Sequence, residues 1–321
     1  MNNCHSCLKI VENKFYCNAC LRRMFNGKLP IMNLKKSEFQ TIRYEMIDHF
    51  SISGVQDKIS LKLEKNELIP TAKNGEYILK PVPHQHLPKF QNDVPANEHL
   101  TMQIAKQIFK ITTAENALIY FNEGGPAYIT KRFDRRDNEK VHVEDFCQIA
   151  GLSPENKGKN YKYQFSCQAS GEIIKKHSSA YKIEIEKLYK LILFNYVFGN
   201  GDAHLKNFSL IESLHGDFIL SPAYDLLNTS IHFPNESRLA LDLFDDFESE
   251  AYKHNGFYGY IDFMKLAEFY ELKPKRAERM MSEFSVLKEK VKNLISLSFL
   301  SEAAKEKYLE IYLDRLKAIE K

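Results

Sequence analysis

The segment Phe198-Gly199-Asn200-Gly201-Asp202-Ala203-His204-Leu205-Lys206-Asn207 lies between two apolar stretches. An apolar helical run from Leu188 to Phe198 precedes it, and apolar residues resume at Phe208. Within the segment, Asp, His, Lys and Asn occur within six residues. Loops held by rigid flanking elements are where proteins commonly place reacting groups. The sequence therefore predicts a polar functional loop between two buried elements.

The spacing within this loop indicates phosphoryl transfer. Asp202 and Asn207 form D-x-x-x-x-N, by which a kinase catalytic loop places a base beside the acceptor hydroxyl and a carboxamide on Mg²⁺. Asp225 follows a short expected strand at 218–221. Because Mg²⁺ takes one or two carboxylates beside phosphate oxygens and water, Asn207 and Asp225 would hold the metal of MgATP, leaving Asp202 as the base. Taken singly, each of these residues is more typical of a turn than of a catalyst.

The composition is that of an ordinary globular chain. Among 321 residues, 44% are hydrophobic and 27% are charged, which is enough core for one large domain or two. Because the formal charge is only +3, overall electrostatic attraction does not favour binding to nucleic acid or to a membrane surface. No secretory signal is visible, and the most apolar stretch, 188–198, is too short to span a bilayer. We therefore expect a cytoplasmic protein that binds neither a membrane nor, directly, DNA.

Two C-x-x-C pairs separated by nine residues stand near the N-terminus. Four thiolates at this spacing predict a closed tetrahedral Zn²⁺ site, because so short a segment has no core of its own. Reduced free thiols and a redox pair are the alternatives, and His5 is a possible substitute ligand. Cys147 and Cys167 have no partner at ligand spacing and are expected to be buried. The four predicted zinc ligands are Cys4, Cys7, Cys17 and Cys20.

A candidate phosphate-binding loop follows. Residues 51–58 bring small hydroxyl residues, a single glycine and Lys58 in front of an alternating strand at 59–63. Backbone N–H groups in such a loop can face phosphate oxygens. With one glycine, the pattern fits an ordinary β-turn equally well.

A lysine and a glutamate further on complete a kinase-like set. Lys80 lies near the end of an expected strand at 76–81, and Glu98 lies in an amphipathic helix that Pro95 opens. A strand lysine paired with a helix glutamate orients the α and β phosphates in kinases. Isolated lysines and glutamates are usually solvated surface charges, so this pair gains weight only from the other motifs.

The composition changes from strand-rich to helix-rich at 131–136. Two strands are expected just before this point, at 116–120 and 127–130. After it, apolar spacing predicts helices at 263–270, 274–297 and 303–319 and a strand at 238–241. We therefore expect a zinc-binding module at 1–30, a strand-rich lobe at 31–135 and a helical lobe at 136–321.

Several motifs occur in the order that a two-lobed kinase needs, although G-x-G-x-x-G, H-R-D and D-F-G are missing. They lie at 51–58, 78–81, 97–99, 131–135, 200–209 and 224–225. Jointly they resemble the HipA-like toxin Ser/Thr kinases of bacterial type II toxin–antitoxin systems, over about residues 45–245.

The resemblance implies an α+β, two-lobed protein-kinase-like fold with a strand-rich N-lobe and a helical C-lobe, preceded here by the small Cys4 zinc-knuckle module. It implies ATP and Mg²⁺ as cofactors and a protein serine as acceptor, in known members on an aminoacyl-tRNA synthetase. It also implies an antitoxin partner that is HipB- or HipS-like. Full-length members contact the antitoxin through an extra N-terminal subdomain, and the cysteine module stands in its place here.

The resemblance also implies residue roles. Asp202 would be the catalytic base, Asn207 and Asp225 would bind Mg²⁺, and 131–133 would form the hinge that receives adenine. The implied nucleotide-binding residues are Ser53, Gly54, Val55, Gln56, Lys58, Lys80, Glu98, Lys131, Phe133, His204, Lys206, Asn207 and Asp225.

In this family a serine of the S-x-S/A-G loop is itself phosphorylated, which disables ATP binding. Ser51 occupies that position. Ser53 is a second candidate, in the Ser-Ile-Ser form typical of the short HipT-like members.

Two other functions are compatible with the motifs. Divergent kinases of this kind also act on small-molecule or lipid-head alcohols. A catalytically idle descendant would instead serve as a regulatory binding protein, although such a descendant has no physical reason to keep Lys80, Asp202, Asn207 and Asp225 together.

Overall fold

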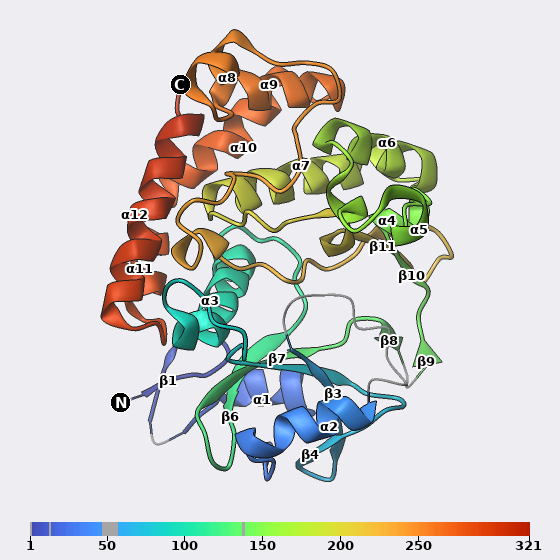
Figure 1. Ribbon diagram of the computed structural model, residues 1–321. Helices are drawn as coiled ribbons and strands as arrows, with labels where there is room; N and C mark the ends of the chain where they lie inside the picture. The colour runs from blue at the N-terminus through green and yellow to red at the C-terminus, as the bar shows by residue number, and fades with distance from the viewer. Residues whose placement is uncertain (1, 13, 47–56, 137–138) are drawn as a thin grey trace.

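The computed structural model describes residues 2–12, 14–46, 57–136 and 139–321. A strand-rich lobe holds the N-terminal part of the chain, and a helical lobe holds the rest (Figure 1). Most of the predicted phosphate loop, including Ser51, Ser53 and 54–56, lies outside the described residues. None of the helices in the part of the chain that the structure describes could span a lipid bilayer.

A five-stranded antiparallel sheet forms the N-terminal lobe, in the order β4-β3-β5-β7-β6. The strands expected in this lobe, at 59–63, 76–81, 116–120 and 127–130, are all present. In the central strand Leu79 is buried on one face, while the next residue, Lys80, pairs with Tyr128 of the neighbouring strand. The strands are β3 (Ile59–Glu64), β4 (Glu67–Pro70), β5 (Tyr77–Pro81), β6 (Asn116–Tyr120) and β7 (Pro126–Lys131).

Both faces of this sheet are covered. Because successive side chains of a strand point to opposite faces, Leu118 and Tyr128 join the core beneath α3 (Val94–Gln107), whereas Ala117 and Ile129 join a second core. The second core includes side chains of residues 2–12 and 14–20, here called the cysteine segment, and of α1 (Asn18–Phe25). The cysteine segment is therefore packed against the sheet, next to α2 (Phe39–Met46) and the 3₁₀ turn η1 (Lys36–Glu38).

The C-terminal lobe is a helical assembly around α7 (Tyr181–Val197), whose apolar side chains are almost all buried. Phe109, just after α3, stacks on Phe284 with ring centroids 4.5 Å apart and meets the edges of Phe194 and Phe198. One core therefore runs from the sheet into the helices. The other helices are α4 (Phe146–Ile149), α5 (Pro154–Lys157), α6 (Cys167–His177), α8 (Glu250–Asn255), α9 (Tyr260–Phe269), α10 (Pro274–Val286), α11 (Lys288–Ser296) and α12 (Glu302–Ile319).

A small antiparallel sheet brings the predicted site residues to one place. Its strands are β10 (Val143–Asp145), β11 (Ser209–Glu212) and β12 (Phe218–Leu220). The loop with Asp202 and Asn207 enters β11, and Asp225 follows β12. Since β11 and β12 are antiparallel neighbours, the entry to one and the exit of the other lie at the same end of the sheet.

Two sequence expectations differ from the structure. Residues 238–241 form no strand, and only an isolated bridge joins Ser166 to Asp242. The alternation that suggested a strand arises because leucines here face the helical core, while the carbonyls of Asp242 and Leu243 accept from N–H groups that begin α6. The stretch 274–297 is two helices, α10 and α11, separated at Leu287.

The remaining elements are short. Two-residue ladders are formed by β1 (Asn2–Asn3) with β2 (Ile10–Val11), and by β8 (Arg135–Arg136) with β9 (Glu139–Lys140). The 3₁₀ turns include η3 (Gln91–Asp93), η4 (Tyr161–Tyr163), η5 (Leu205–Asn207) and η6 (Thr229–Ile231).

The ring of Phe109 should be a major contributor to stability, because it is 1% exposed where the two lobes share a core. We expect Phe109→Ala to lower the free energy of unfolding by about 3–5 kcal/mol, as large cavities in cores do. Phe247→Ala is the control, since Phe247 is 39% exposed. Chemical denaturation measures both, and equal losses would contradict the shared core.

Candidate active-site cleft

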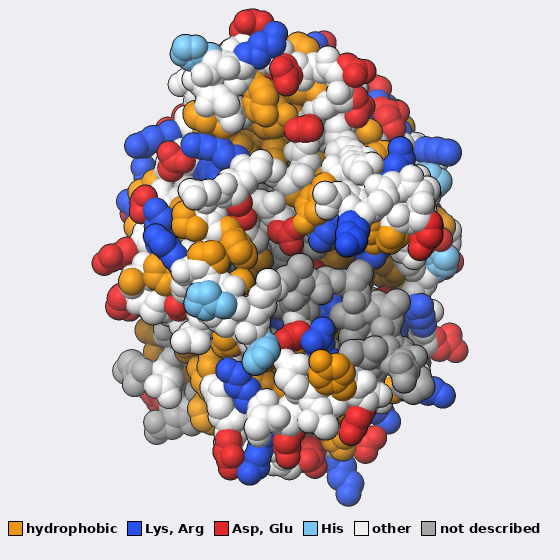
Figure 2. All heavy atoms as spheres, in the orientation of Figure 1, with side chains coloured by type: hydrophobic (Ala, Val, Ile, Leu, Met, Phe, Trp, Pro, Cys, Tyr) orange, Lys and Arg blue, Asp and Glu red, His pale blue; other side chains and the backbone are white. Residues whose placement is uncertain are grey.

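A cleft of about 560 Å³ lies between the two lobes. Figure 2 shows acidic and basic side chains next to one another on the surface where the two lobes meet. Predicted site residues that line the cleft are Lys58, Lys80 and Glu98 from the N-terminal lobe, and Asp202, His204, Lys206, Asn207 and Asp225 from the C-terminal lobe.

Lys80 is buried between two carboxylates. Its Nζ lies 2.7 Å from Oε1 of Glu98 and also donates to Oδ1 of Asp225. The side chains of Lys80 and Glu98 are 6% and 2% exposed, whereas that of Asp225 is 37% exposed toward the cleft. A strand, a helix and the segment after β12 thus meet at one ammonium group.

Burial and mutual attraction act together on these charges. Burial raises the pKa of Glu98 to about 7, against the opposing effect of the Lys80 ammonium. Burial alone would raise the pKa of Asp225 as well, but Lys80 and then Lys58 hold it below its ordinary value. Burial lowers the pKa of Lys80, and the charges of Asp225 and Glu98 more than reverse this. Lys80 therefore keeps its proton and Asp225 stays ionised at neutral pH.

Asn207 and Asp225 are in direct contact, and both carry oxygen atoms of the kind that bind a divalent cation. Asn207 donates from Nδ2 to Oδ2 of Asp225 over 3.2 Å, and its Oδ1 accepts from the backbone N–H of His204 over 3.1 Å. Because a backbone N–H can only donate, this bond fixes which end of the amide is oxygen. One carboxylate and one carboxamide oxygen with a spare lone pair fit Mg²⁺ beside phosphate oxygens and water.

The backbone around these groups is unusually constrained. Asp225 has φ +54°, a left-handed conformation that non-glycine residues seldom adopt and that often marks functional positions. Its carbonyl accepts from Nδ2 of Asn200 at 3.4 Å. At Gly201, a Cβ would lie only 2.7 Å from the carbonyl oxygen of Ser237. A residue with a side chain could not occupy position 201 without moving the loop that carries Asp202.

Asp202 lies at the mouth of the cleft with 53% of its side chain exposed. Its Oδ1 accepts from the hydroxyl of Tyr163 over 2.5 Å, and Nε2 of His204 lies 4.0 Å away. Tyr163 belongs to η4, 39 residues earlier in the chain. Sequence reasoning missed this contact, because no motif spacing connects the two residues.

His204 is buried behind Asp202. Burial, and to a smaller extent the nearby Lys162, outweigh the attraction of Asp202 and lower the pKa of His204 to about 4. The ring of Tyr163 packs edge-on against it, with centroids 5.3 Å apart. His204 is therefore an uncharged ring at physiological pH, buried next to Asp202 at the cleft.

The two predicted hinge residues lie differently. The Lys131 ammonium is 3.2 Å from Oδ1 of Asn26, next to the end of α1, and Lys131 is not among the residues lining the cleft. The ring of Phe133 lies 5.5 Å from that of Tyr224, which does line the cleft. Contacts of 131–133 with adenine stay a prediction.

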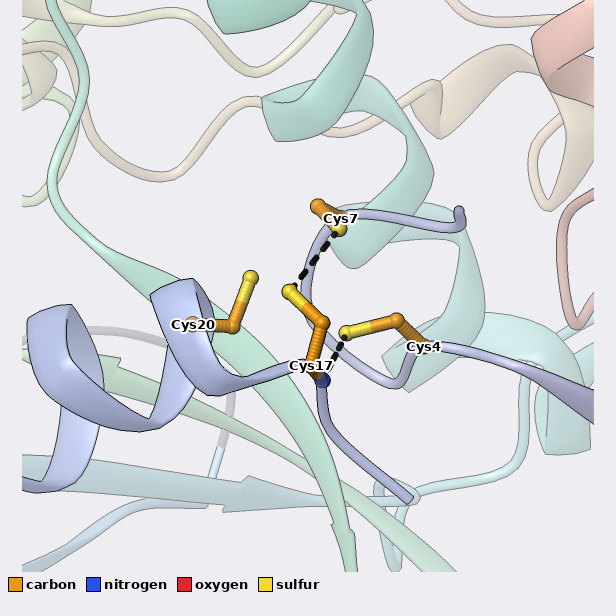
Figure 3. Close-up of side chains that lie close together, drawn as sticks. All are labelled: Cys4, Cys7, Cys17 and Cys20. Atoms are coloured by element: carbon orange, nitrogen blue, oxygen red, sulfur yellow. Dashed lines mark hydrogen bonds between the residues drawn. The ribbon is translucent and has the colours of Figure 1, made fainter. Parts of the chain in front are cut away.

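The four N-terminal cysteines converge from two segments (Figure 3). All four sulfur atoms lie within 4.8 Å of one another, and Sγ of Cys7 and Cys17 are 3.8 Å apart. Four sulfurs at about 2.3 Å from a tetrahedral Zn²⁺ are about 3.8 Å apart, so the spacing fits this ion. The His5 ring instead packs against Phe15 and Phe299.

Comparisons with known proteins agree with this arrangement. The model of the HipA-like C-terminal domain family matches residues 50–291. A Haemophilus influenzae protein named "Putative kinase" is 30% identical over 309 residues, which cover 91% of this chain and 87% of that protein. The Shewanella oneidensis serine/threonine-protein kinase toxin HipA is 26% identical over 221 residues, which cover 63% of this chain and 48% of that protein.

Two solved structures share the fold. HipA of Shewanella oneidensis, in complex with HipB and operator DNA, matches with a TM-score of 0.65 and 21% identity, over 90% of this chain and 72% of that chain. The Helicobacter pylori proinflammatory kinase CtkA matches with a TM-score of 0.50 and 15% identity, over 81% of this chain and 90% of that chain. The predicted two-lobed kinase-like fold is thereby confirmed.

The buried neutral His204 predicts a pH dependence of stability. Its pKa of about 4 in the folded chain lies below the ordinary 6.5, so below pH 6.5 the unfolded chain binds a proton that the folded chain does not. Stability from this group is complete above pH 6.5 and is lost as pH falls toward 4. We expect a loss of roughly 2 kcal/mol between pH 6.5 and 5.

Denaturation of the wild type and His204→Gln from pH 7.5 to 5 measures this effect. The variant, which lacks the titrating ring, should lose less stability over that range. Parallel curves for the two proteins would show that His204 is not held neutral.

Proposed function

This chain belongs to the family of HipA-like proteins, and we propose that it is an Mg-ATP-dependent serine/threonine protein kinase that acts as the toxin of a toxin–antitoxin system. One observation carries the proposal: Lys80, Glu98, Asp202, Asn207 and Asp225 surround a single cleft although they come from distant parts of the sequence. Each has the chemistry that a phosphoryl-transfer site requires.

In the proposed reaction the chain acts mainly by positioning and by charge. Lys80, held by Glu98, would bind phosphate oxygens of ATP, while the Asn207 and Asp225 oxygens would hold Mg²⁺. When bound, the cation would neutralise negative charge on the phosphate groups. Asp202 would orient the acceptor hydroxyl and take its proton as the oxygen–phosphorus bond to the γ-phosphoryl group forms and the bond to ADP breaks.

A protein acceptor is favoured over a small alcohol by the open position of Asp202. Its side chain is 53% exposed, so a segment of another protein could reach it. The Shewanella relative is named a serine/threonine-protein kinase toxin. On the basis of the family resemblance alone, our candidate for the acceptor protein is an aminoacyl-tRNA synthetase. A small-molecule or lipid-head kinase is the alternative, and phosphorylation of a free polyol without any protein acceptor would favour it.

We propose an antitoxin of the HipB or HipS kind as the partner, no direct DNA contact by this chain, and action in the cytoplasm. Zn²⁺ is proposed as the ion held by the four cysteines, on the basis of their number and spacing.

Removing the carboxylate of Asp202 tests the proposed base. We expect Asp202→Ala to abolish phosphoryl transfer to protein while leaving ATP affinity within about threefold, because Asp202 would contact the acceptor and not the nucleotide. Radiolabel transfer to a lysate or to the chain itself measures the first quantity, and calorimetric titration with Mg-ATP measures the second.

Asp246→Ala is the matched control, since Asp246 is exposed on a loop and does not line the cleft. It should keep wild-type turnover. Normal turnover in Asp202→Ala would refute the assignment of Asp202 as the base. A wild-type protein that binds ATP but transfers no phosphate would instead favour the catalytically idle binding protein.

Self-phosphorylation of the loop before β3 is a separate prediction. A phosphate on Ser51 or Ser53 adds close to two negative charges where ATP phosphates would lie, and should block nucleotide entry. We expect phosphate on one of these serines after incubation with Mg-ATP, and none in Asp202→Ala. Peptide mass spectrometry detects it. A Ser51→Asp/Ser53→Asp variant that binds ATP as tightly as the wild type would exclude the block.

A further inference from the structure

The segment between the first two cysteines is joined to the helix that carries Glu98. Nε2 of His99, the next residue in α3, lies 2.8 Å from the carbonyl oxygen of Ser6. Because a carbonyl can only accept, Nε2 carries the proton. At the end of the same helix, Gln107 donates from Nε2 to the carbonyl oxygen of Cys7 over 3.0 Å.

The cysteine segment is also hydrogen-bonded to the sheet and to the C-terminal lobe. The N–H of Leu118 in β6 donates to the carbonyl of His5 over 2.7 Å. Asn3 donates from Nδ2 to the carbonyl of Leu297 at the end of α11 over 2.7 Å, and the rings of His5 and Phe299 are 5.0 Å apart. The segment therefore lies where α3, the sheet and the helical lobe meet.

The carbonyls of Ser6 and Cys7 can accept these bonds only while the turn between Cys4 and Cys7 keeps its shape. That turn has little secondary structure of its own, since β1 and β2 have two residues each. Two backbone bonds close the turn: the N–H of Leu8 donates to the carbonyl of Cys4 over 2.9 Å, and the N–H of Cys4 donates to the carbonyl of Lys9 over 2.8 Å. The turn is joined to the second half of the segment by the bond from the N–H of His5 to the carbonyl of Phe15, by the bond from the N–H of Cys17 to Sγ of Cys4, and by the four adjacent thiols (Figure 3). A metal ion bound to all four sulfurs would fix the two halves of the segment together.

A shift of α3 would move Glu98 directly, because Glu98 lies in this helix. Its pairing with Lys80 is buried on both sides, so a shift of the helix would take one hydrogen-bond partner away from the buried Lys80 ammonium. The same helix contacts the C-terminal lobe through Asn97, which donates to the carbonyl of Asn228 over 2.9 Å.

We propose that a thiophilic divalent cation bound by Cys4, Cys7, Cys17 and Cys20 is a positioning element of the nucleotide site, because it holds the Ser6 and Cys7 carbonyls against α3 and thereby keeps Glu98 on Lys80. His99 is the positioning residue that makes this connection. The nucleotide readout rests on the kinase function proposed above.

The first experiment uses the full chain with and without metal. Zinc content is measured by mass spectrometry of the metal. Mg-ATP affinity is measured by calorimetry. The exchange of amide hydrogens in 94–107 is measured by peptide mass spectrometry. Chelated protein and Cys7→Ser should bind Mg-ATP at least tenfold more weakly and exchange faster in α3. Cys167→Ser is the matched control, because Cys167 is buried but lies outside the cluster.

The second experiment separates positioning from mere folding of the N-terminus. His99→Leu removes the donor to Ser6 without touching a thiol, whereas His99→Gln keeps an N–H donor at a similar reach. His99→Leu should retain one equivalent of zinc but bind Mg-ATP about tenfold more weakly, and chelation should then weaken binding little further. His99→Gln should restore most of the affinity.

Opposite results overturn the proposal. These are wild-type affinity and unchanged α3 exchange in the metal-free chain, or wild-type affinity in a zinc-loaded His99→Leu protein. If Cys7→Ser fails to fold, the His99 pair still decides the question. If the zinc-loaded wild type binds no nucleotide, the kinase proposal fails, and faster α3 exchange on chelation alone then supports the connection while unchanged exchange refutes it.

Discussion

The structure depends on one buried ammonium group. Lys80 sits in the central strand of the sheet, Glu98 in the helix that covers it, and Asp225 in the segment that leaves the small sheet of the other lobe. A buried charge is costly unless it is paired and hydrogen-bonded, so these three elements must meet at Lys80 for the chain to fold as it does. The pairing therefore constrains the site and the lobe arrangement together.

Helix α3 is the element through which this constraint spreads. One residue before Glu98, Asn97 is fully buried and bonds to Asn228 and His232 of the C-terminal lobe. One residue after Glu98, His99 bonds to the cysteine segment. Beyond the helix, Phe109 enters the helical core. The carboxylate that pairs with Lys80 is thus fixed by contacts to three separate parts of the molecule.

Local pattern was sufficient to predict much of this fold. Alternation at 59–63 and 116–120 and helical spacing around Glu98 reflect burial of one face, which neighbouring residues encode. Contacts between distant segments could not be predicted from such local patterns. The hydroxyl of Tyr163 on Asp202 and the Lys131 ammonium beside α1 depend on how loops and helices pack, and no spacing in the sequence records either. The alternation at 238–241 misled for the same reason, since it matches a helical core and not a partner strand.

The cysteine segment also covers part of the edge of the five-stranded sheet. The outermost strand β6 directs the N–H and carbonyl of Leu118 outward, where the carbonyl of His5 accepts from the one and the hydroxyl of Tyr16 donates to the other. On the opposite rim, Leu68 of β4 donates to the carbonyl of Ile31. Unpaired strand edges invite a strand from another molecule, and that route leads to aggregation. His5 and Tyr16 at one rim and Ile31 at the other thus block strand addition at these positions.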